Sequence, residues 1–231
     1  MRRHAVFDLD GTLLDSVPLC AEILNAMLAR RGAAARVTGD QTRRYASGGG
    51  LAMVTALLGG DCGDPHLAIA EFRERYAAMP TPPTSLYPGV REGLARLVSH
   101  GVELAIFSNK PQALCEKVLT ELSIAALFSA VVGARPGLPP KPDPAGFFMA
   151  LKIAGGTASR SCYIGDSELD HAVAARAGVP FVMVTYGYAD PAETFPNAHL
   201  AHSFADATSI SESNLVRRSP RPPPGVLKSV A

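Results

Sequence analysis

The chain has 231 residues, enough for one large domain or two smaller ones, and nearly half are apolar, so its composition permits a full hydrophobic core. The formal net charge of +1 gives no electrostatic reason to expect nucleic acid or an anionic membrane as a partner. The longest uncharged runs are too short to cross a bilayer. The first expected strand begins close to the N-terminus and leaves no room for a signal peptide, so we expect a cytoplasmic protein.

Two carboxylates stand one residue apart near the start of the chain. The apolar residues 5–7 predict the end of a short buried strand, and Asp8 and Asp10 follow it just before Gly11 breaks the extended pattern. Side chains alternate along a strand, so the two acids are expected to point the same way. Crowded acids repel one another unless a cation lies between them or one holds a proton. An exposed strand end, with both acids in water, would also explain the pair.

The next segment is helical throughout. After Ser16, apolar residues recur at three- and four-residue spacing, and three further helices are predicted at residues 38–46, 51–58 and 64–79. A glycine-rich loop at residues 47–50 separates two of these helices. Prolines within residues 79–84 then predict a stiff, extended link back to the main body. The pattern therefore predicts an all-helical insertion over residues 16–83.

Strands and helices alternate in the remainder of the chain. Strands are predicted at residues 102–108, 130–133, 161–165, 180–185 and, more weakly, 199–203. Because the strands are almost continuously apolar, we expect an α/β fold with a parallel sheet covered on both faces. Residues 1–15 and 84–210 would form this core. Past Ser211 the periodicity is lost and the chain becomes rich in proline and arginine, so residues 211–231 are expected to form a poorly ordered tail.

Four cysteines are scattered along the chain, at Cys20, Cys62, Cys115 and Cys162. They form no C-x-x-C pair, which makes a zinc site of closely spaced thiolates a poor interpretation. We expect buried free thiols in a reducing compartment.

Polar residues follow each of the first four predicted strands of the sheet. The paired acids follow the first strand, Ser108 and Asn109 the second, Lys141 the third, and Asp166 with Asp170 the fourth. Ligands of parallel α/β sheets bind at this carboxyl edge. Three acids around one point indicate a hard divalent cation, best matched by Mg²⁺. A hydroxyl, an amide and a lysine opposite them indicate a phosphoryl group. Taken singly, the Ser-Asn pair and the acidic pair are explained as helix caps, and the lysine as a solvated loop residue. Together, these residues predict phosphoryl transfer.

This order of residues resembles the haloacid dehalogenase superfamily. Its D-x-D-G-T signature stands at residues 8–12, its strand-ending Ser or Thr at Ser108, its lysine at Lys141, and its acidic pair at Asp166 and Asp170. The resemblance covers roughly residues 4–205. It implies a Rossmann-like core, with a cap domain where the helical insertion stands.

The details of the motifs resemble one branch of the superfamily. An acid at the position of Asp10 is found in its phosphatases and phosphomutases, but not in its dehalogenases and phosphonate hydrolases. The chain is most similar to phosphoglycolate phosphatases, over residues 7–16, 108–111, 141–144, 164–170 and 184–188. The resemblance implies hydrolysis of a small phosphate monoester, with 2-phosphoglycolate as the expected substrate, through an aspartyl-phosphate.

The resemblance also implies roles for individual residues. Asp8 is expected to attack phosphorus, and Asp10 to protonate the leaving alkoxide and then accept a proton from water. Mg²⁺ would be held by Asp8, the carbonyl of Asp10 and Asp166, with Asp170 and Thr12 supporting the site. Ser108, Asn109 and Lys141 are expected to stabilise charge on the transferring oxygens.

The helical insertion is expected to decide the substrate. Arg43 and Arg44 are candidates to bind a substrate carboxylate, although a solvated helix face explains them equally well. Hydrolysis of a sugar phosphate or pyrophosphate, or a phosphomutase reaction, remain alternatives. A catalytically silent binding protein would be expected to lose a nucleophile or metal ligand, and this chain keeps them. The expected partner is a small phosphorylated metabolite, and the sequence leaves open whether the protein is a monomer or a homodimer.

Overall fold

The computed structural model describes residues 2–190 and 194–217 and shows a six-stranded sheet in which every neighbouring pair is parallel. The strand order is β3-β2-β1-β4-β5-β6, so β1 lies near the middle of the sheet. The strands are β1 (Arg3–Phe7), β2 (Val102–Pro111), β3 (Phe128–Ala134), β4 (Ser161–Gly165), β5 (Phe181–Val184) and β6 (His199–Ala201).

Successive residues of β1 point to opposite faces of the sheet, and both faces are covered. Ala5 and Phe7 belong to one apolar cluster, with α5, α6 and α9, whereas Val6 belongs to a second, with α7 and α8. The bounds are α5 (Val90–Ser99), α6 (Gln112–Glu121), α7 (Ala145–Ile153), α8 (Glu168–Ala177) and α9 (Phe204–Arg217). Burial on both sides explains why the strands are almost continuously apolar. The predicted α/β fold with a Rossmann-like parallel sheet is confirmed.

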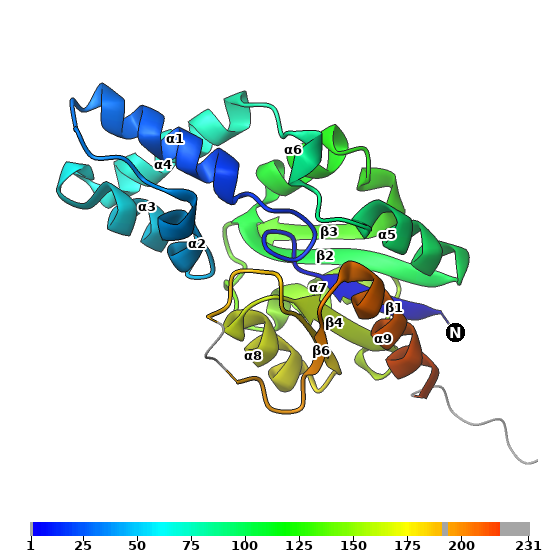
Figure 1. Cartoon of the computed structure of the whole chain (residues 1–231). Coiled ribbons are helices and arrows are strands. Elements are labelled where there is room, and N and C mark those ends of the chain that lie inside the picture. Colours follow the sequence, from blue (N-terminus) through cyan, green and yellow to red (C-terminus); the bar gives the residue numbers. More distant parts are fainter. Residues whose placement is uncertain (1, 191–193, 218–231) are drawn as a thin grey trace, which may run out of the picture.

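The helices of the predicted insertion gather at one end of the molecule (Figure 1). They are α1 (Val17–Arg30), α2 (Gly39–Ala46), α3 (Gly50–Leu58) and α4 (Pro65–Ala78), and we refer to them as the cap helices. Thr38 and Gln41 form a capping box at the start of α2, and Asp64 caps α4 through two backbone N–H groups. That residues 16–83 are a separate domain stays a prediction.

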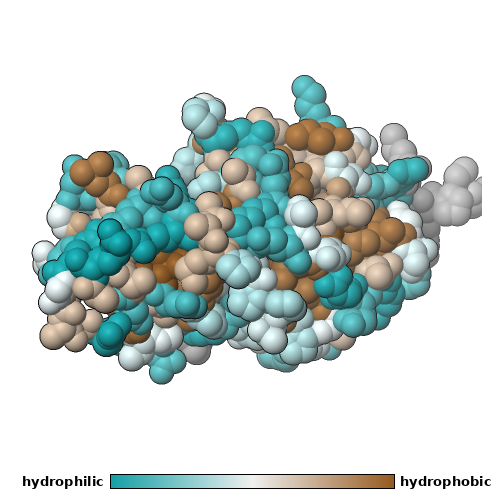
Figure 2. Space-filling model, turned by 90° about the horizontal axis from the view of Figure 1, so that it is seen from above, coloured by the Kyte–Doolittle hydropathy of each residue, from teal (hydrophilic) through white to brown (hydrophobic). Residues whose placement is uncertain are grey.

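Short 3₁₀ turns complete the described part of the chain, at Gly59–Asp61, Pro83–Ser85, Ala125–Leu127 and Ala158–Arg160. Within the described ranges, no helix is both long enough and apolar enough to cross a bilayer. Seen from above, the surface is largely hydrophilic or intermediate, and strongly apolar residues form small separate groups (Figure 2).

Helix α9 was not expected from the sequence, and it corrects the predicted start of the tail. The helix continues to Arg217, and Leu215 is 1% exposed, so placing a poorly ordered tail from residue 211 was wrong for its first turns. Serines interrupt the apolar repeat by which this helix could have been predicted. The hydroxyls of Ser211 and Ser213 donate to the carbonyls of Ala207 and Ser209 one turn earlier, which satisfies them within the helix. The remainder of the predicted tail, residues 218–231, lies outside the described residues.

Candidate active site

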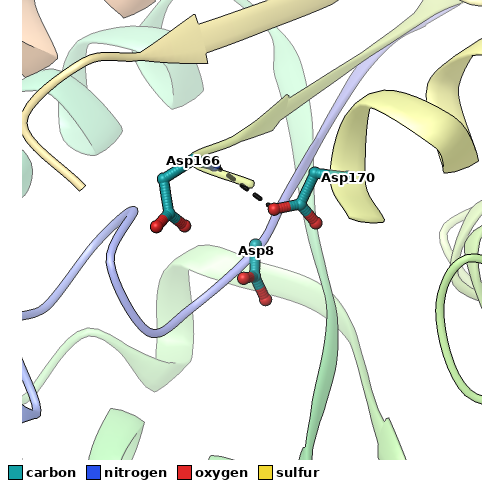
Figure 3. A group of neighbouring side chains, drawn as sticks. All are labelled: Asp8, Asp166 and Asp170. Carbon is teal, nitrogen blue, oxygen red and sulfur yellow. Dashed lines mark hydrogen bonds between the residues drawn. The ribbon is translucent and has the colours of Figure 1, made fainter. Parts of the chain in front are cut away.

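Three carboxylates converge at the carboxyl edge of the sheet (Figure 3). Asp8 follows β1, Asp166 follows β4, and Asp170 stands in the first turn of α8, so topology alone brings them to one edge. One oxygen from each lies within 4.8 Å of the others. The structure therefore brings these three predicted site residues together.

The chain packs so tightly around Asp166 that glycine is required beside it. Gly11 has φ +82°, a left-handed conformation, and a Cβ there would lie 2.1 Å from Oδ2 of Asp166. At Gly187 a Cβ would lie 2.2 Å from Cβ of Asp166. These two close approaches fix the carboxylate between the loop after β1 and the loop after β5.

The carboxylate of Asp166 is held by two donors. The hydroxyl of Thr12 donates to Oδ1 at 2.8 Å, and the backbone N–H of Tyr188 donates to Oδ2 at 2.8 Å. Burial raises the pKa of Asp166 well above its usual range, and the neighbouring Asp170 and Asp8 raise it further. Thr12, which was expected to support the site, thus contacts Asp166.

Asp170 is more fully occupied by protein donors. Its Oδ1 accepts from Nζ of Lys141 at 2.6 Å and from the hydroxyl of Tyr163 at 2.9 Å, and its Oδ2 accepts from the hydroxyl of Ser167 at 2.6 Å. The side chain is fully buried. Asp170 therefore holds Lys141 in place.

Lys141 reaches the acid cluster from the loop before α7. Its Nζ lies 2.8 Å from Oδ1 of Asp8, and its backbone N–H donates to Oδ1 of Asn109 at 2.8 Å. Burial, the largest influence on the pKa of Lys141, acts to lower it, but Asp170 and Asp8 raise it above the usual value, so the ammonium stays charged. Asn109 positions this loop through its side-chain oxygen, a contact that the sequence did not predict.

The acid cluster carries more negative charge than one lysine balances. Burial raises the pKa of Asp8 to about 6, with Lys141 opposing the rise and Asp170 adding to it. A group of crowded, buried carboxylates with hard oxygen donors is the chemistry that suits a divalent cation such as Mg²⁺. The residues present therefore fit a metal of this kind.

The cluster opens into a cavity of about 120 Å³ between the core and the cap helices. Its core side includes Asp8, Asp10, Asp166, Ser108, Asn109 and Lys141. Its cap side includes Phe72, Arg73 and Tyr76 of α4, together with Met53 of α3. These six predicted residues therefore line one shared space beneath the cap helices, whereas Asp170 and Thr12 are not among its lining residues.

Lys110 is a cavity residue to which the sequence analysis gave no role. Its Nζ lies 3.0 Å from each carboxylate oxygen of Asp10 and 4.1 Å from the centre of the Tyr76 ring on α4. Burial acts to lower the pKa of Lys110, but Asp10 and Tyr76 raise it well above the usual value. Strand β2 runs on to Pro111, so the two-residue period that places Ser108 at the site could also have identified Lys110.

The two cap arginines singled out from the sequence do not line the cavity. Arg43 donates to Oδ2 of Asp15 at 2.9 Å and to the carbonyl of Gly187 at 3.0 Å, which ties α2 to the core. Arg44 is also not among the lining residues, whereas Arg73 of α4 is. Arg43 lies away from the cavity because it pairs with Asp15, a partner that the motifs did not indicate.

Comparisons with known proteins agree with this arrangement. The model of a family described as haloacid dehalogenase-like hydrolase matches residues 5–184. The chain is 38% identical over 191 residues to a phosphoglycolate phosphatase from Pseudomonas syringae pv. syringae, covering 79% of this chain and 69% of the relative. It is 34% identical over 196 residues to a phosphoglycolate phosphatase from Rhodospirillum rubrum, covering 81% of each.

A solved structure is similar over almost its full length. The crystal structure of a predicted phosphoglycolate phosphatase from Haemophilus somnus matches with a TM-score of 0.81 and 27% identity, covering 90% of this chain and 97% of that one. The family match spans most of the chain, and the motif residues within it surround one cavity. The chain therefore belongs to the haloacid dehalogenase-like hydrolase family.

Proposed function

We propose that this protein is a Mg²⁺-dependent phosphatase that hydrolyses 2-phosphoglycolate through an aspartyl-phosphate on Asp8. The observation that carries the proposal is the position of Asp8, whose carboxylate lies 2.8 Å from the ammonium of Lys141 and faces the cavity beside Asp166. Relatives named phosphoglycolate phosphatases, at 34–38% identity, support this choice of substrate.

The metal would be held by the carboxylates of Asp8 and Asp166 and by the carbonyl of Asp10. When bound, Mg²⁺ neutralises charge on the phosphoryl oxygens, which lets a negatively charged substrate approach the acids. Asp170, saturated by Lys141, Tyr163 and Ser167, would keep Lys141 in place instead of serving as the main ligand.

In the first step, a carboxylate oxygen of Asp8 forms a bond to phosphorus while the bond from phosphorus to the ester oxygen breaks. Asp10 donates its proton to that oxygen, and glycolate leaves. In the second step, Asp10 accepts a proton from water as the water oxygen attacks the phosphorus of the aspartyl-phosphate. Inorganic phosphate is released, and the carboxylate of Asp8 is restored.

Lys141 and Ser108 complete the site on the phosphate side. The ammonium of Lys141 already contacts Asp8, so it lies where charge develops on the transferring oxygens. Ser108 is 3% exposed and lines the same cavity, and its hydroxyl would donate to a phosphoryl oxygen. Asn109 would contribute through its amide N–H groups, since its oxygen is engaged by the backbone of Lys141.

The cap helices would form a second domain over the cavity, where they would limit substrate size and restrict the access of bulk water. The predicted cytoplasmic location also remains a proposal. It is supported by the buried free thiols of Cys20, Cys62 and Cys115, which suit a reducing compartment.

A panel of phosphate esters tests the proposal. Phosphate release is measured for phosphoglycolate, a hexose phosphate, pyrophosphate and an aryl phosphate, with Mg²⁺ and with EDTA. We expect the highest kcat/KM for phosphoglycolate and loss of turnover in EDTA. A higher kcat/KM for one of the other compounds would reject the substrate, and no release from any of them would reject a phosphatase.

A further inference from the structure

Lys110 occupies an unusual position at the boundary between the core and the cap helices. Its side chain is 7% exposed, its ammonium contacts both oxygens of Asp10, and the ring of Tyr76 from α4 covers it at 4.1 Å. Lys110, Asp10 and Tyr76 all line the cavity. The ammonium is therefore a nearly desolvated positive charge directed at the space where a substrate would lie.

An ion pair alone gives little reason to place a lysine there. Taking two charges out of water offsets most of their mutual attraction, so buried pairs are weak contributors to stability. The other buried cation of the cavity, Lys141, is already engaged by Asp8 and Asp170. Among the described residues that line the cavity, Lys110 is thus the buried cation that contacts Asp10.

The proposed substrate is so short that its carboxylate must lie close to Asp10. In phosphoglycolate, a single methylene separates the ester oxygen from the carboxylate carbon. If Asp10 protonates the ester oxygen, the carboxylate of the substrate must lie within a few bonds of the side chain of Asp10. A cation in contact with both oxygens of Asp10 is therefore within reach of that carboxylate as well.

We propose that Lys110 is the specificity-determining residue that recognises the carboxylate of the substrate. This inference rests on the proposed phosphoglycolate phosphatase activity. The ammonium shares its hydrogen bonds between Asp10 and the substrate carboxylate, while the Tyr76 ring holds it from the cap side. A phosphate ester without that carboxylate makes no such contact with the ammonium, so it binds less favourably than phosphoglycolate.

The test compares two substrates that differ at this one group. Phosphoglycolate and ethyl phosphate share the phosphate and the methylene, but ethyl phosphate carries a methyl group in place of the carboxylate. The quantity measured is the ratio of their kcat/KM values for the wild-type protein and for Lys110→Met. An effect of the substitution on Asp10 acts on both substrates, so the ratio reports mainly on the carboxylate.

We expect Lys110→Met to reduce the ratio roughly 10- to 100-fold, the range for losing a hydrogen bond to a charged group. Lys110→Arg, which keeps the charge, should retain most of the preference. Lys110→Gln serves if the methionine variant does not fold, as judged by thermal unfolding. A ratio that stays within about threefold of wild type in a folded neutral variant would overturn the proposal.

Two further variants serve as controls. Lys152→Met removes an exposed lysine of α7 outside the cavity and should leave the ratio unchanged. Arg73→Met removes an exposed cation of the cavity, and because water screens it we expect a change of less than about fivefold. If Arg73→Met abolishes the preference while Lys110→Met keeps it, Arg73 is the recognition residue and our assignment is wrong.

The same measurement separates a failure of the proposed substrate from a failure of the role proposed for Lys110. If the wild-type protein releases phosphate from ethyl phosphate as efficiently as from phosphoglycolate, there is no preference to explain. The choice of phosphoglycolate as substrate and the role of Lys110 then fall together, while the phosphatase activity stands. A wild-type preference that survives loss of the Lys110 charge rejects only the role of Lys110.

Discussion

The ammonium of Lys141 lies 2.8 Å from Oδ1 of Asp8, and it links this carboxylate to Asp170, which it contacts at 2.6 Å. The three side chains come from the segments that follow three different strands, β1, β3 and β4, so their contact depends on the sheet that brings these segments together. The pairing leaves Asp8 directed at the cavity and in reach of a positive charge. Both features are required of a carboxylate that attacks a phosphate.

Replacing Asp8 with asparagine should therefore abolish turnover and leave the fold intact. We expect phosphate release to fall by at least roughly a thousandfold, because an amide oxygen does not form the covalent intermediate. Circular dichroism should show unchanged secondary structure. An Asp206→Asn variant, altered on the exposed part of α9, should keep wild-type activity. Activity within tenfold of wild type in Asp8→Asn would exclude Asp8 as the nucleophile.

The same substitution should change how stability depends on pH in the metal-free protein. Burial raises the pKa of Asp8 to about 6 from an ordinary value of 3.8, so its protonated form favours the folded state. This stabilisation is fully present below about pH 3.8 and is lost as the pH rises through about 6. Denaturant unfolding in EDTA should show wild type losing stability relative to Asp8→Asn over this window. A constant difference between the two proteins would contradict the raised pKa.

Removing the metal should lower stability as well as activity. With Mg²⁺ a hundredfold above its dissociation constant, linkage gives about 2.7 kcal/mol, or roughly 5–10 °C in Tm for a chain of this size. Asp166→Asn should lose most of this rise, since it removes a proposed ligand. Differential scanning fluorimetry with Mg²⁺ and with EDTA measures both effects. An equal rise in Asp166→Asn and wild type would argue against Asp166 as a ligand.

Gly11→Ala should disturb the acid cluster more than a comparable glycine substitution elsewhere. Gly11 and Gly32 both have positive φ, at +82° and +72°, which costs a side chain about 1–2 kcal/mol. Of these two glycines, Gly11 is the one at which a Cβ would meet Asp166, at 2.1 Å, which adds about 1–3 kcal/mol of overpacking. Urea unfolding should find Gly11→Ala the less stable variant, and the Tm rise on adding Mg²⁺ should shrink only there. Equal stability of the two variants would show that the loop after β1 can shift away from Asp166 at no cost in the free energy of unfolding.

The residues predicted from strand ends are the ones that the structure brings together. Asp8, Ser108, Lys141 and Asp166 all line one cavity, although they are far apart in sequence. They could be predicted because parallel strands connected by helices present their carboxyl ends at one edge. This constraint acts on the backbone, so it requires no knowledge of how individual side chains pack.

The cap-side contacts could not be predicted in this way. Whether Arg43 or Arg73 faces the cavity depends on how the cap helices dock, and Arg43 instead pairs with Asp15 beside the ring of Tyr188. The contact between Lys110 and Tyr76 likewise joins strand β2 to a cap helix. Helix α9 was missed for a local reason, because its serines hydrogen-bond within the helix and interrupt the apolar pattern.

The place of β1 in the sheet has a consequence for synthesis on the ribosome. This strand pairs with β2 at Val102 and beyond and with β4 at Ser161 and beyond. Strand β1 therefore stays unpaired until residues 102–106 have emerged, and its other edge stays open until residues 161–164 follow. A nascent chain that pauses before β4 exposes the hydrophobic strand next to Asp8 and presents a ready target for chaperones.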